Sequence, residues 1–396
     1  MLVVISTLWR GSAVLLAALL QSGTVLYLGT SISGGDAVTY LGLSDYWLST
    51  GDLLSPDAFE GNFWPAGYPG FLALFAWAGE NQIIAIRMAQ ILLAAAIALM
   101  AGVLADQISR KAGTVTTVLV AFSPTSLWAV WAIGYELVLG FLLMTALVLA
   151  MRSATSGNRV SSTTAGLLFG LAILVQFRAV LAVLLIVVLV GAQSKRVGAY
   201  LSMGALVPVL LWSVRSFIAL GTPAPWSANG PYNLWNGNNP VATGHNVFPL
   251  PDLPAGYTSY TSAALDWIVQ NPADFAVLTA KKFLFLFEPT RISGISDPFP
   301  GEILVTGLEV VLAAFLVSGT VLFLSLRLIS RERELQPLDA PFWFAVAYLL
   351  PNVVFIVEAR FAIPVHAVLI AVSVGAFYVL HVKLSSRTQL LSRSAS

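Results

Sequence analysis

Residues 32–70 have the sequence ISGGDAVTYLGLSDYWLSTGDLLSPDAFEGNFWPAGYPG and follow the first long apolar segment of the chain. This stretch contains no lysine or arginine but holds five acidic residues: Asp36, Asp45, Asp52, Asp57 and Glu60. Asp36 comes within a few residues of the apolar segment, so we expect it at a membrane surface rather than in bulk solvent. Two interpretations are open: Asp36 caps a helix that starts near Ala37, or it is a catalytic base at the lip of the bilayer.

The composition of the chain is that of a polytopic helical membrane protein. Of its 396 residues 58% are hydrophobic and only 10% are charged, and the mean hydropathy is +0.84. A formal net charge of +1 leaves no basic face for a phosphate backbone, which argues against nucleic acid as a partner. The absence of cysteine excludes disulfides, thiolate metal sites and a cysteine nucleophile.

Ten apolar segments are candidates for transmembrane helices, because each approaches the roughly 17–25 residues that a span needs. We place them near residues 9–31, 82–105, 113–131, 134–151, 163–177, 179–193, 197–219, 302–326, 340–357 and 361–382. The least secure boundary is the one between the fifth and sixth segments, at Gln176-Phe177-Arg178. The sequence thus predicts an all-α bundle in a single transmembrane domain, 1–383, followed by a disordered cytoplasmic tail at 384–396.

Two long loops, 32–81 and 220–301, interrupt the apolar segments, and we expect them to form the cap of an active site. Each should carry an interfacial helix. In the first loop the short apolar stretch at 65–79 predicts a helix that begins at Pro69. In the second loop residues 265–289 predict an amphipathic helix.

The basic residues predict which side of the membrane each loop faces. On this assignment one set of loops and both termini hold 13 of the 20 basic residues but only 4 of the 19 acids. The positive-inside rule places that set in the cytoplasm and the two long loops outside. We therefore expect a multi-pass protein of the plasma (inner) membrane, with both termini cytoplasmic and the active site facing outside.

Function in such a chain depends on ionisable residues at the outer ends of spans, where a charge that faces lipid is costly. We single out ten: Asp36, Arg87, Glu136, Arg178, Arg215, Lys281, Lys282, Arg291, Glu358 and Arg360. Glu136 opens a helix, where the helix dipole alone would stabilise an acid. Lys281 and Lys282 suit lipid headgroups. Glu358 and Arg360 are two residues apart, so they do not face each other on a helix and suit interfacial anchors.

Arg178 has fewer structural explanations, because it occupies a tight turn between two apolar runs and only snorkelling accounts for it. Motifs of soluble enzymes are missing: the sequence has no Walker loop, no HExxH and no GxSxG. The three histidines share no spacing that suggests a metal site. Chemistry must therefore come from acids and arginines at the membrane surface.

Six stretches, spread over almost the whole chain, carry a resemblance to a known family. They are GGDAVTY with Asp36, NFWPAGYPGFLALF, IGYELVLGFLL with Glu136, GLLFGLAILVQFRAVLAVLL with Arg178, WSVRSFIALGTPAPWSANGPYNLWNGNNPVATG, and VEARFAIPVHAVLIAV with Glu358 and Arg360. Their order resembles the GT-C membrane glycosyltransferases. The most similar group depends on polyprenyl-phosphate sugars and includes the dolichyl-phosphate-mannose protein mannosyltransferases and the lipid A aminoarabinose transferases. At residues 63–66, FWPA, many relatives have a charged residue and two prolines, which favours a distinct subfamily with its own acceptor.

The resemblance implies an inverting transfer of a sugar from a polyprenyl monophosphate to an acceptor hydroxyl on the extracytoplasmic side. Asp36 would accept the hydroxyl proton. Glu136 would orient the acceptor or pair with one of the cations of the site, and Tyr68 would lie on the acceptor side or bind sugar hydroxyls. The donor phosphate would contact the cations Arg178, Arg215, Lys282 and Arg360. The sugar would bind a loop that contains Asn233, Asn236, Asn238 and Asn239.

The resemblance leaves the substrates open. Mannose is the first expectation for the sugar, and arabinose or another pentose is the second. The acceptor is a glycolipid, a polysaccharide or a protein. No cofactor is required and no metal ligand is assigned, although a divalent metal held by Asp36 and other loop acids is an alternative.

A different class of function, a secondary transporter or lipid flippase, also suits ten spans with charged residues. A transporter should show internal repeats and helices broken near the membrane midplane, with charges there. The sequence shows no convincing repeat, and its charges cluster at the outer ends of spans. A purely structural scaffold would leave the pattern of acids and arginines unexplained.

Overall fold

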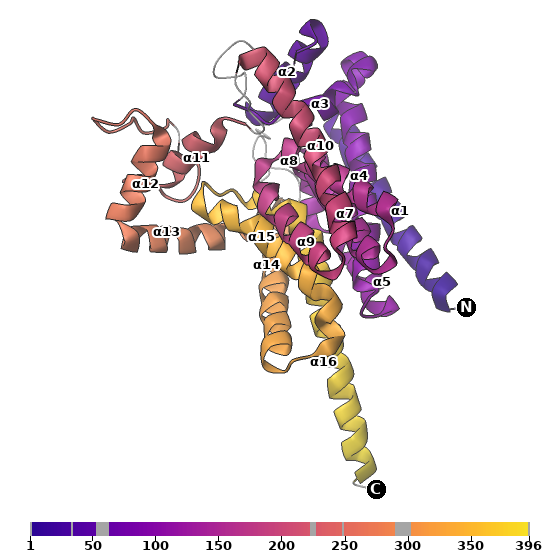
Figure 1. Cartoon of the computed structure of the whole chain (residues 1–396). Helices are drawn as coiled ribbons and strands as arrows, with labels where there is room; N and C mark the ends of the chain where they lie inside the picture. The colour runs from indigo at the N-terminus through magenta and orange to yellow at the C-terminus, as the bar shows by residue number, and fades with distance from the viewer. Residues whose placement is uncertain are drawn as a thin grey trace.

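The computed structural model describes residues 2–32, 35–52, 63–221, 227–247, 249–289 and 302–394. Its elements are helices throughout, and no strand occurs among these residues (Figure 1). This confirms the predicted all-α fold class. Asp57, Glu60 and Arg291, which the sequence singles out, lie outside the described residues.

Six helices are long and apolar enough to cross a membrane, and a bent pair raises the number to seven. They are Thr7–Leu28, Ala76–Ala105, Glu136–Ser156, Lys195–Leu220, Ile303–Ile329 and Ala359–Ser386. The bent pair joins α5 (Arg110–Ala121) to α6 (Pro124–Trp131) at an angle of 44°. All ten predicted segments contain helix, but α8 (Arg159–Val175) and α9 (Val180–Gln193) have only 17 and 14 residues. The chain is an integral membrane protein, and the number of ten spans stays a prediction.

The closest helix packing in the bundle is that of α8 against α7 (Glu136–Ser156) and α10 (Lys195–Leu220). Glycines permit a close approach there, since a Cβ at Gly166 would lie 2.2 Å from the carbonyl oxygen of Leu201. Helices in lipid associate through such small residues, because lipid tails offer no hydrophobic drive between helices. Five further helices complete the bundle: α1 (Leu2–Leu28), α4 (Gln82–Ala105), α14 (Glu302–Leu324), α15 (Asp339–Val354) and α16 (Ile363–Ser394).

Both long loops contain helices among their described residues. In the first, α2 (Gly35–Thr50) precedes α3 (Gly67–Ala73), which begins two residues before the predicted start at Pro69. In the second, α11 (Asn229–Gly237), α12 (Tyr260–Gln270) and α13 (Pro272–Phe285) lie to one side of the bundle (Figure 1). The single helix predicted over 265–289 is wrong, because Pro272 starts a new helix at its first turn, where a missing N–H costs nothing.

The end of the chain also differs from the expectation. α16 continues to Ser394 and extends away from the bundle, through residues for which the sequence predicts a disordered tail (Figure 1). The segment 384–394 contains leucine, arginine and glutamine and neither glycine nor proline, so a helix can continue despite its polarity.

One end of the bundle is held by ion pairs. Arg10 Nη2 lies 2.5 Å from Asp106 Oδ1, and Arg327 Nη2 lies 2.5 Å from Asp339 Oδ2. These residues come from segments predicted to face the cytoplasm, and Asp106 lines the same cavity as Arg333. Segments predicted to share a side of the membrane therefore share an end of the bundle. Which end faces the cytoplasm stays a prediction.

Candidate active site

A cavity of about 220 Å³ lies at the opposite end, where the first turn of α2, the start of α7 and the α8–α9 turn meet the segment before α16. Its charged lining residues are Asp36, Arg178, Glu358 and Arg360. The remaining lining residues are aromatic or polar apart from Pro65 and Ile356: Tyr40, Phe63, Trp64, Pro65, Tyr135, Gln176, Asn229, Tyr232, Asn233, Asn246, Ile356 and Phe361. The cavity thus brings together four charged residues that the sequence singles out.

Arg360 lies at the centre of these charges. Its Nη2 donates to Asp36 Oδ2 at 2.6 Å, and its Nε donates to Glu358 Oε2 at 2.5 Å. Its Nη1 lies 3.6 Å from Glu136 Oε1. The guanidinium presents its donors in a rigid planar fork, so one arginine is able to hold several carboxylates in fixed directions.

The ion pair between Glu358 and Arg360 corrects an expectation. On an α-helix residues two apart do not face each other. Here Glu358 has extended backbone dihedrals, φ −131° and ψ 145°, and Arg360 follows in the short 3₁₀ helix η5 (Ala359–Ala362). The change of backbone direction between them brings the two side chains together, so they are partners in the cavity wall rather than independent anchors.

Glu136 does not line the cavity but lies next to it, where it contacts Arg360. It is the first residue of α7, as predicted, and only 1% of it is exposed. A buried carboxylate needs a compensating charge, and Arg360 supplies one from the cavity side while the amino end of α7 supplies a favourable dipole. Both the structural and the functional interpretation of Glu136 are therefore compatible with its position.

Arg178 is held differently from Arg360. It lies in the 3₁₀ turn η2 (Phe177–Ala179) between α8 and α9, where the sequence predicts a tight turn. Its Nη1 donates to Asn352 Oδ1 at 2.9 Å, and its guanidinium lies 3.9 Å from the centroid of the Phe361 ring. No carboxylate pairs with it among the residues that the structure describes. Arg178 is thus the cation of the cavity that is not already committed to an acid.

Asn352 explains why Arg178 has a fixed direction. The Asn352 amide nitrogen donates to the carbonyl oxygens of Tyr348 and Leu349, at 3.1 and 3.3 Å. These bonds settle the amide orientation and turn its oxygen toward the guanidinium. A charged side chain whose partners are fixed in this way needs little reorganisation when a substrate arrives.

Aromatic side chains form much of the remaining wall. Tyr40 lies one helical turn after Asp36 on α2, and its ring meets Trp64 edge-on with centroids 5.4 Å apart. Burial is the main cause that raises the pKa of Tyr40 well above its usual value, and burial raises the pKa of Tyr135 to about 12. Both phenols therefore stay protonated at neutral pH.

The asparagine-rich loop contributes only in part. Asn233 lines the cavity, whereas Asn236, Asn238 and Asn239 are buried beside it. Asn236 donates to Asn246 Oδ1 at 2.6 Å, and Asn239 donates to the carbonyl oxygen of Trp235. Asn238 donates to the carbonyl oxygens of Leu234 in its own helix and of Val354 at the end of α15. The structure thus gives these three amides a role in folding the loop and places none of them on the cavity.

Three other predicted site residues also lie outside the cavity lining: Arg215, Tyr68 and Lys282. Arg215 pairs with Asp52 at 2.6 Å, so Asp52 is not simply a solvated acid. Tyr68 is fully buried and donates to Gln90 Oε1 at 3.1 Å. The structure does not bring either side chain to Asp36, and their predicted roles find no support in this geometry.

Lys282 is also outside the cavity, and it is fully buried on α13. Its Nζ donates to Asn238 Oδ1 at 3.2 Å and to the carbonyl oxygen of Val354 at 3.3 Å. Burial lowers the pKa of Lys282 to about 8. Its neighbour Lys281 is exposed, as expected for a headgroup contact.

Comparison with known proteins identifies the fold. Neither a protein-family model nor a curated protein sequence matches the chain. The oligosaccharyltransferase of Archaeoglobus fulgidus in its apo form matches with a TM-score of 0.52 and 13% identity, over 97% of this chain and 52% of that one. Its complex with Zn and sulfate gives 0.51 and 14%, over 97% and 51%. The chain has the GT-C membrane fold.

The chain spans about half the length of that oligosaccharyltransferase. A second GT-C structure, ArnT from Cupriavidus metallidurans in the apo state, covers 95% of this chain and 77% of its own at a TM-score of 0.41 and 14% identity. At 13–14% identity the likeness to the oligosaccharyltransferase shows the fold alone, and function has to be argued from the site itself.

Several lining residues of this GT-C site are absent from the sequence-based prediction. Tyr40 could have been found, because it is four residues after Asp36 and helical residues at that spacing share a face. Trp64 lies in the FWPA stretch, residues 63–66, where this sequence differs from the family that it resembles. Tyr232 carries no local signal, since only the packing of distant segments brings it to the cavity. The same holds for Asn352, which does not line the cavity but accepts from Arg178.

Among the described residues, no group of three histidine, aspartate or glutamate side chains is arranged to hold a metal ion. The three carboxylates around Arg360 do converge, but the guanidinium occupies the space between them. Metal dependence stays a prediction from the sequence.

Proposed function

We propose that this protein is an inverting glycosyltransferase that moves a sugar from a polyprenyl monophosphate to an acceptor hydroxyl at the extracytoplasmic membrane surface. The observation that supports it most is that Asp36 and Arg178 line one cavity, an acid and an uncommitted cation facing the same space. Such a transfer requires both: a base for the acceptor proton, and a positive charge for the phosphate that leaves.

Asp36 has the position of the base. Arg360 holds its Oδ2 at 2.6 Å, and within the described part of the chain no donor contacts its Oδ1. A third of the side chain, 35%, is exposed, so an acceptor hydroxyl has access to the unoccupied oxygen. A carboxylate with one fixed oxygen is oriented for proton transfer, which matters as much as its basicity.

Arg178 has the position of the phosphate contact. In the transfer the acceptor oxygen forms a bond to the anomeric carbon while the bond from that carbon to the phosphate oxygen breaks. The acceptor proton goes to Asp36, and the phosphate leaves as a monoester with added negative charge. A charge-assisted hydrogen bond from Arg178 would stabilise that charge.

Arg360 fits a positioning role better than the phosphate contact that the sequence suggests. Its charge is shared by Asp36, Glu136 and Glu358, so little of it is left for a substrate anion. Arg215 and Lys282 have partners of their own outside the cavity. Of the four predicted phosphate contacts, Arg178 therefore carries the proposal.

The walls of the cavity suit a single sugar. Ligand sites commonly occupy about 300–1,000 Å³, and the present volume of about 220 Å³ favours one sugar unit over an oligosaccharide. Asn233 and Tyr135 offer polar groups for hydroxyls, and the aromatic rings offer apolar faces for the C–H bonds of a pyranose. Mannose is the first candidate and a pentose the second, with a glycolipid, polysaccharide or protein as acceptor.

The experiment uses the purified full-length protein, a radiolabelled polyprenyl-phosphate mannose and membrane extract as the source of acceptor. We expect a labelled glycosidic product whose anomeric configuration is opposite to that of the donor. A matching assay with labelled polyprenyl-phosphate arabinose decides between the two sugars. Absence of product with both donors, under conditions where the protein stays folded, contradicts the proposal.

The transporter alternative has one observation in its favour, the 44° bend between α5 and α6, since transporters use broken helices. The charged groups of the cavity nevertheless lie at helix ends rather than in the middle of spans. Proteoliposomes separate the two functions: a transporter moves labelled substrate across the membrane and leaves it unchanged, whereas a transferase yields a glycosidic bond.

A further inference from the structure

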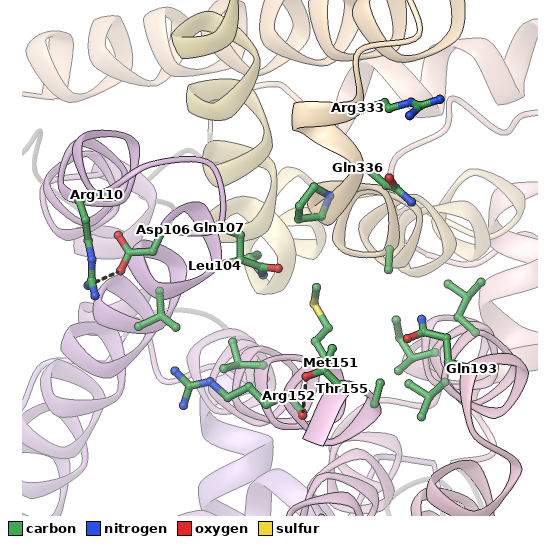
Figure 2. A pocket seen from close by; sticks show the side chains of 18 residues that line it. Leu104, Asp106, Gln107, Arg110, Met151, Arg152, Thr155, Gln193, Arg333 and Gln336 are labelled. Carbon is green, nitrogen blue, oxygen red and sulfur yellow. Dashed lines mark hydrogen bonds and ion pairs between the residues drawn. The ribbon is translucent and has the colours of Figure 1, made fainter. Parts of the chain in front are cut away.

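The larger of the cavities described here lies at the other end of the bundle from Asp36 (Figure 2). Its volume is about 810 Å³, within the range of about 300–1,000 Å³ that is usual for ligand sites. It is formed by the ends of α4, α7 and α9 and by the segment before α15. α7 begins with Glu136 behind the first cavity and reaches this one at Thr155, roughly 30 Å away at 1.5 Å per residue.

The floor of the second cavity is aliphatic. Leu104, Val148, Ile186 and Val190 line it, and each is at most 8% exposed. They come from three different helices, so the apolar surface continues from one helix to the next. A floor of this kind favours hydrocarbon over a hydrated ion.

The rim of the cavity is basic. Arg110, Arg152 and Arg333 stand around it from three separate elements (Figure 2). The acid at the rim, Asp106, is already paired with Arg10 at 2.5 Å and with Arg110 at 3.1 Å. Neither Arg152 nor Arg333 donates a hydrogen bond or forms an ion pair within the described residues. Two guanidinium groups therefore remain available to an anion at the mouth of an aliphatic cavity.

We propose that this cavity binds an anionic glycerophospholipid, with the anionic headgroup at the rim that holds Arg152 and Arg333 and an acyl chain along the aliphatic floor. The charge of the rim complements an anionic headgroup, and the floor complements a hydrocarbon chain. A soluble anion would leave the floor uncovered, and a zwitterionic lipid would bring a cationic group to a rim that is already basic. The site is separate from the proposed transfer reaction and does not depend on it.

The test is native mass spectrometry of the full-length protein in neutral detergent, titrated with a short-chain phosphatidylglycerol or with phosphatidylcholine of the same chains. We expect one bound phosphatidylglycerol, held about tenfold more tightly than phosphatidylcholine. Both lipids offer an anionic phosphate, but the choline cation of phosphatidylcholine would be repelled by the basic rim, and a repulsion of about 1.4 kcal/mol corresponds to a factor of ten. The double variant Arg152→Gln/Arg333→Gln should lose this preference. Equal binding of the two lipids to the unaltered protein overturns the proposal.

A matched control removes two positive charges from the same end of the bundle but outside the cavity lining. Lys195 and Arg196 are exposed at the start of α10, directly after the lining residue Gln193. Lys195→Gln/Arg196→Gln should keep the preference for phosphatidylglycerol, and an equal loss in both double variants would show that only the general charge matters.

A second variant tests the aliphatic floor independently of the charges. Ala154 lines the cavity from α7, so Ala154→Phe places a ring in the space and should weaken binding of both lipids. Thermal unfolding confirms that each variant is folded. If inorganic phosphate displaces phosphatidylglycerol at equal concentration, the rim binds a free anion and the lipid site is wrong.

Discussion

At the Glu136 end of α7 the chain gathers three carboxylates around one arginine, whereas at the Thr155 end it gathers arginines around an acid that is already paired. The first cavity measures about 220 Å³ and the second about 810 Å³. The smaller cavity is lined by aromatic and polar side chains, and the larger one has an aliphatic floor. The larger cavity is therefore not the one that holds the proposed catalytic residues.

The two cavities differ in which of their charged side chains have no partner of opposite charge among the described residues. In the small cavity Asp36 keeps one oxygen without a donor among the described residues, and Arg178 keeps a guanidinium without a carboxylate. The proposed base and the proposed phosphate contact are both present there. In the large cavity only cations are left over, which suits binding of an anion but supplies no base.

Substitution of Arg178 should lower the rate of transfer the most, if a cation without a carboxylate partner is what distinguishes the small cavity. Arg178→Ala should lower the rate of transfer about 10²–10³-fold, as the loss of one preorganised donor does in other enzymes. Arg178→Lys should recover part of it, because the charge returns without the planar fork. The control is Arg215→Ala, which removes an arginine paired with Asp52 outside the cavity. The measurement is the rate of transfer at saturating acceptor. Equal losses of rate in Arg178→Ala and Arg215→Ala would contradict the assignment of Arg178 as the phosphate contact.

Arg360 should matter for stability as well as activity, since three carboxylates share its charge. Arg360→Gln leaves these acids uncompensated and should lower the free energy of unfolding by about 3 kcal/mol. Arg360→Lys should show a smaller deficit, because it keeps the positive charge. Thermal unfolding is the measurement, and equal deficits in Arg360→Gln and Arg360→Lys would contradict a shared counter-ion.

Lys282 offers a pH test at a buried cation that is outside both cavities. Its pKa is about 8 in the folded protein, against an ordinary value of 10.5. Between these values the unfolded chain binds the proton and the folded chain does not, so stability rises with pH by up to about 3 kcal/mol. Lys282→Met should remove this rise, whereas Lys281→Met at the exposed neighbour should keep it. Melting temperatures from pH 7.5 to 10 provide the comparison.

The two kinds of asparagine in the second loop should separate into different phenotypes. Asn236→Ala removes hydrogen bonds to Asn246 and Val247 in a buried segment and should cost about 1–3 kcal/mol of stability. Asn233→Ala, on the cavity, should slow transfer several-fold and change stability by less than about 0.5 kcal/mol. Slowed transfer in both variants without any loss of stability would mean that the loop binds sugar along its whole length.

The features that local patterns control were predicted from the sequence. The apolar segments predicted where the long helices lie. The turn at Gln176-Phe177-Arg178 separates α8 from α9, as expected. The start of α7 at Glu136 was also expected. These features depend on hydrophobic length and on turn residues, which a sequence shows directly.

The partners of the charged groups could not be predicted in the same way. Arg360 reaches Asp36 because η5 follows an extended residue, and the sequence gives no sign of that change of direction. Asn236, Asn238 and Asn239 resemble sugar-binding residues in composition, yet in the structure Asn236 and Asn239 bond within the loop and Asn238 also bonds to Val354 of α15. Buried amides must satisfy their own hydrogen bonds first, and which ones are buried depends on the packing of distant segments.

Asp36 carries the central claim, and Asp45 on the same helix gives its matched control, because it is exposed and has no partner among the described residues. The decisive measurement is single-turnover transfer by purified Asp36→Asn and Asp45→Asn, with donor binding measured on the same preparations. The account predicts a loss of about 10²–10⁴ in rate for Asp36→Asn with donor binding retained, and no change for Asp45→Asn. Transfer at the unaltered rate in folded Asp36→Asn would contradict it.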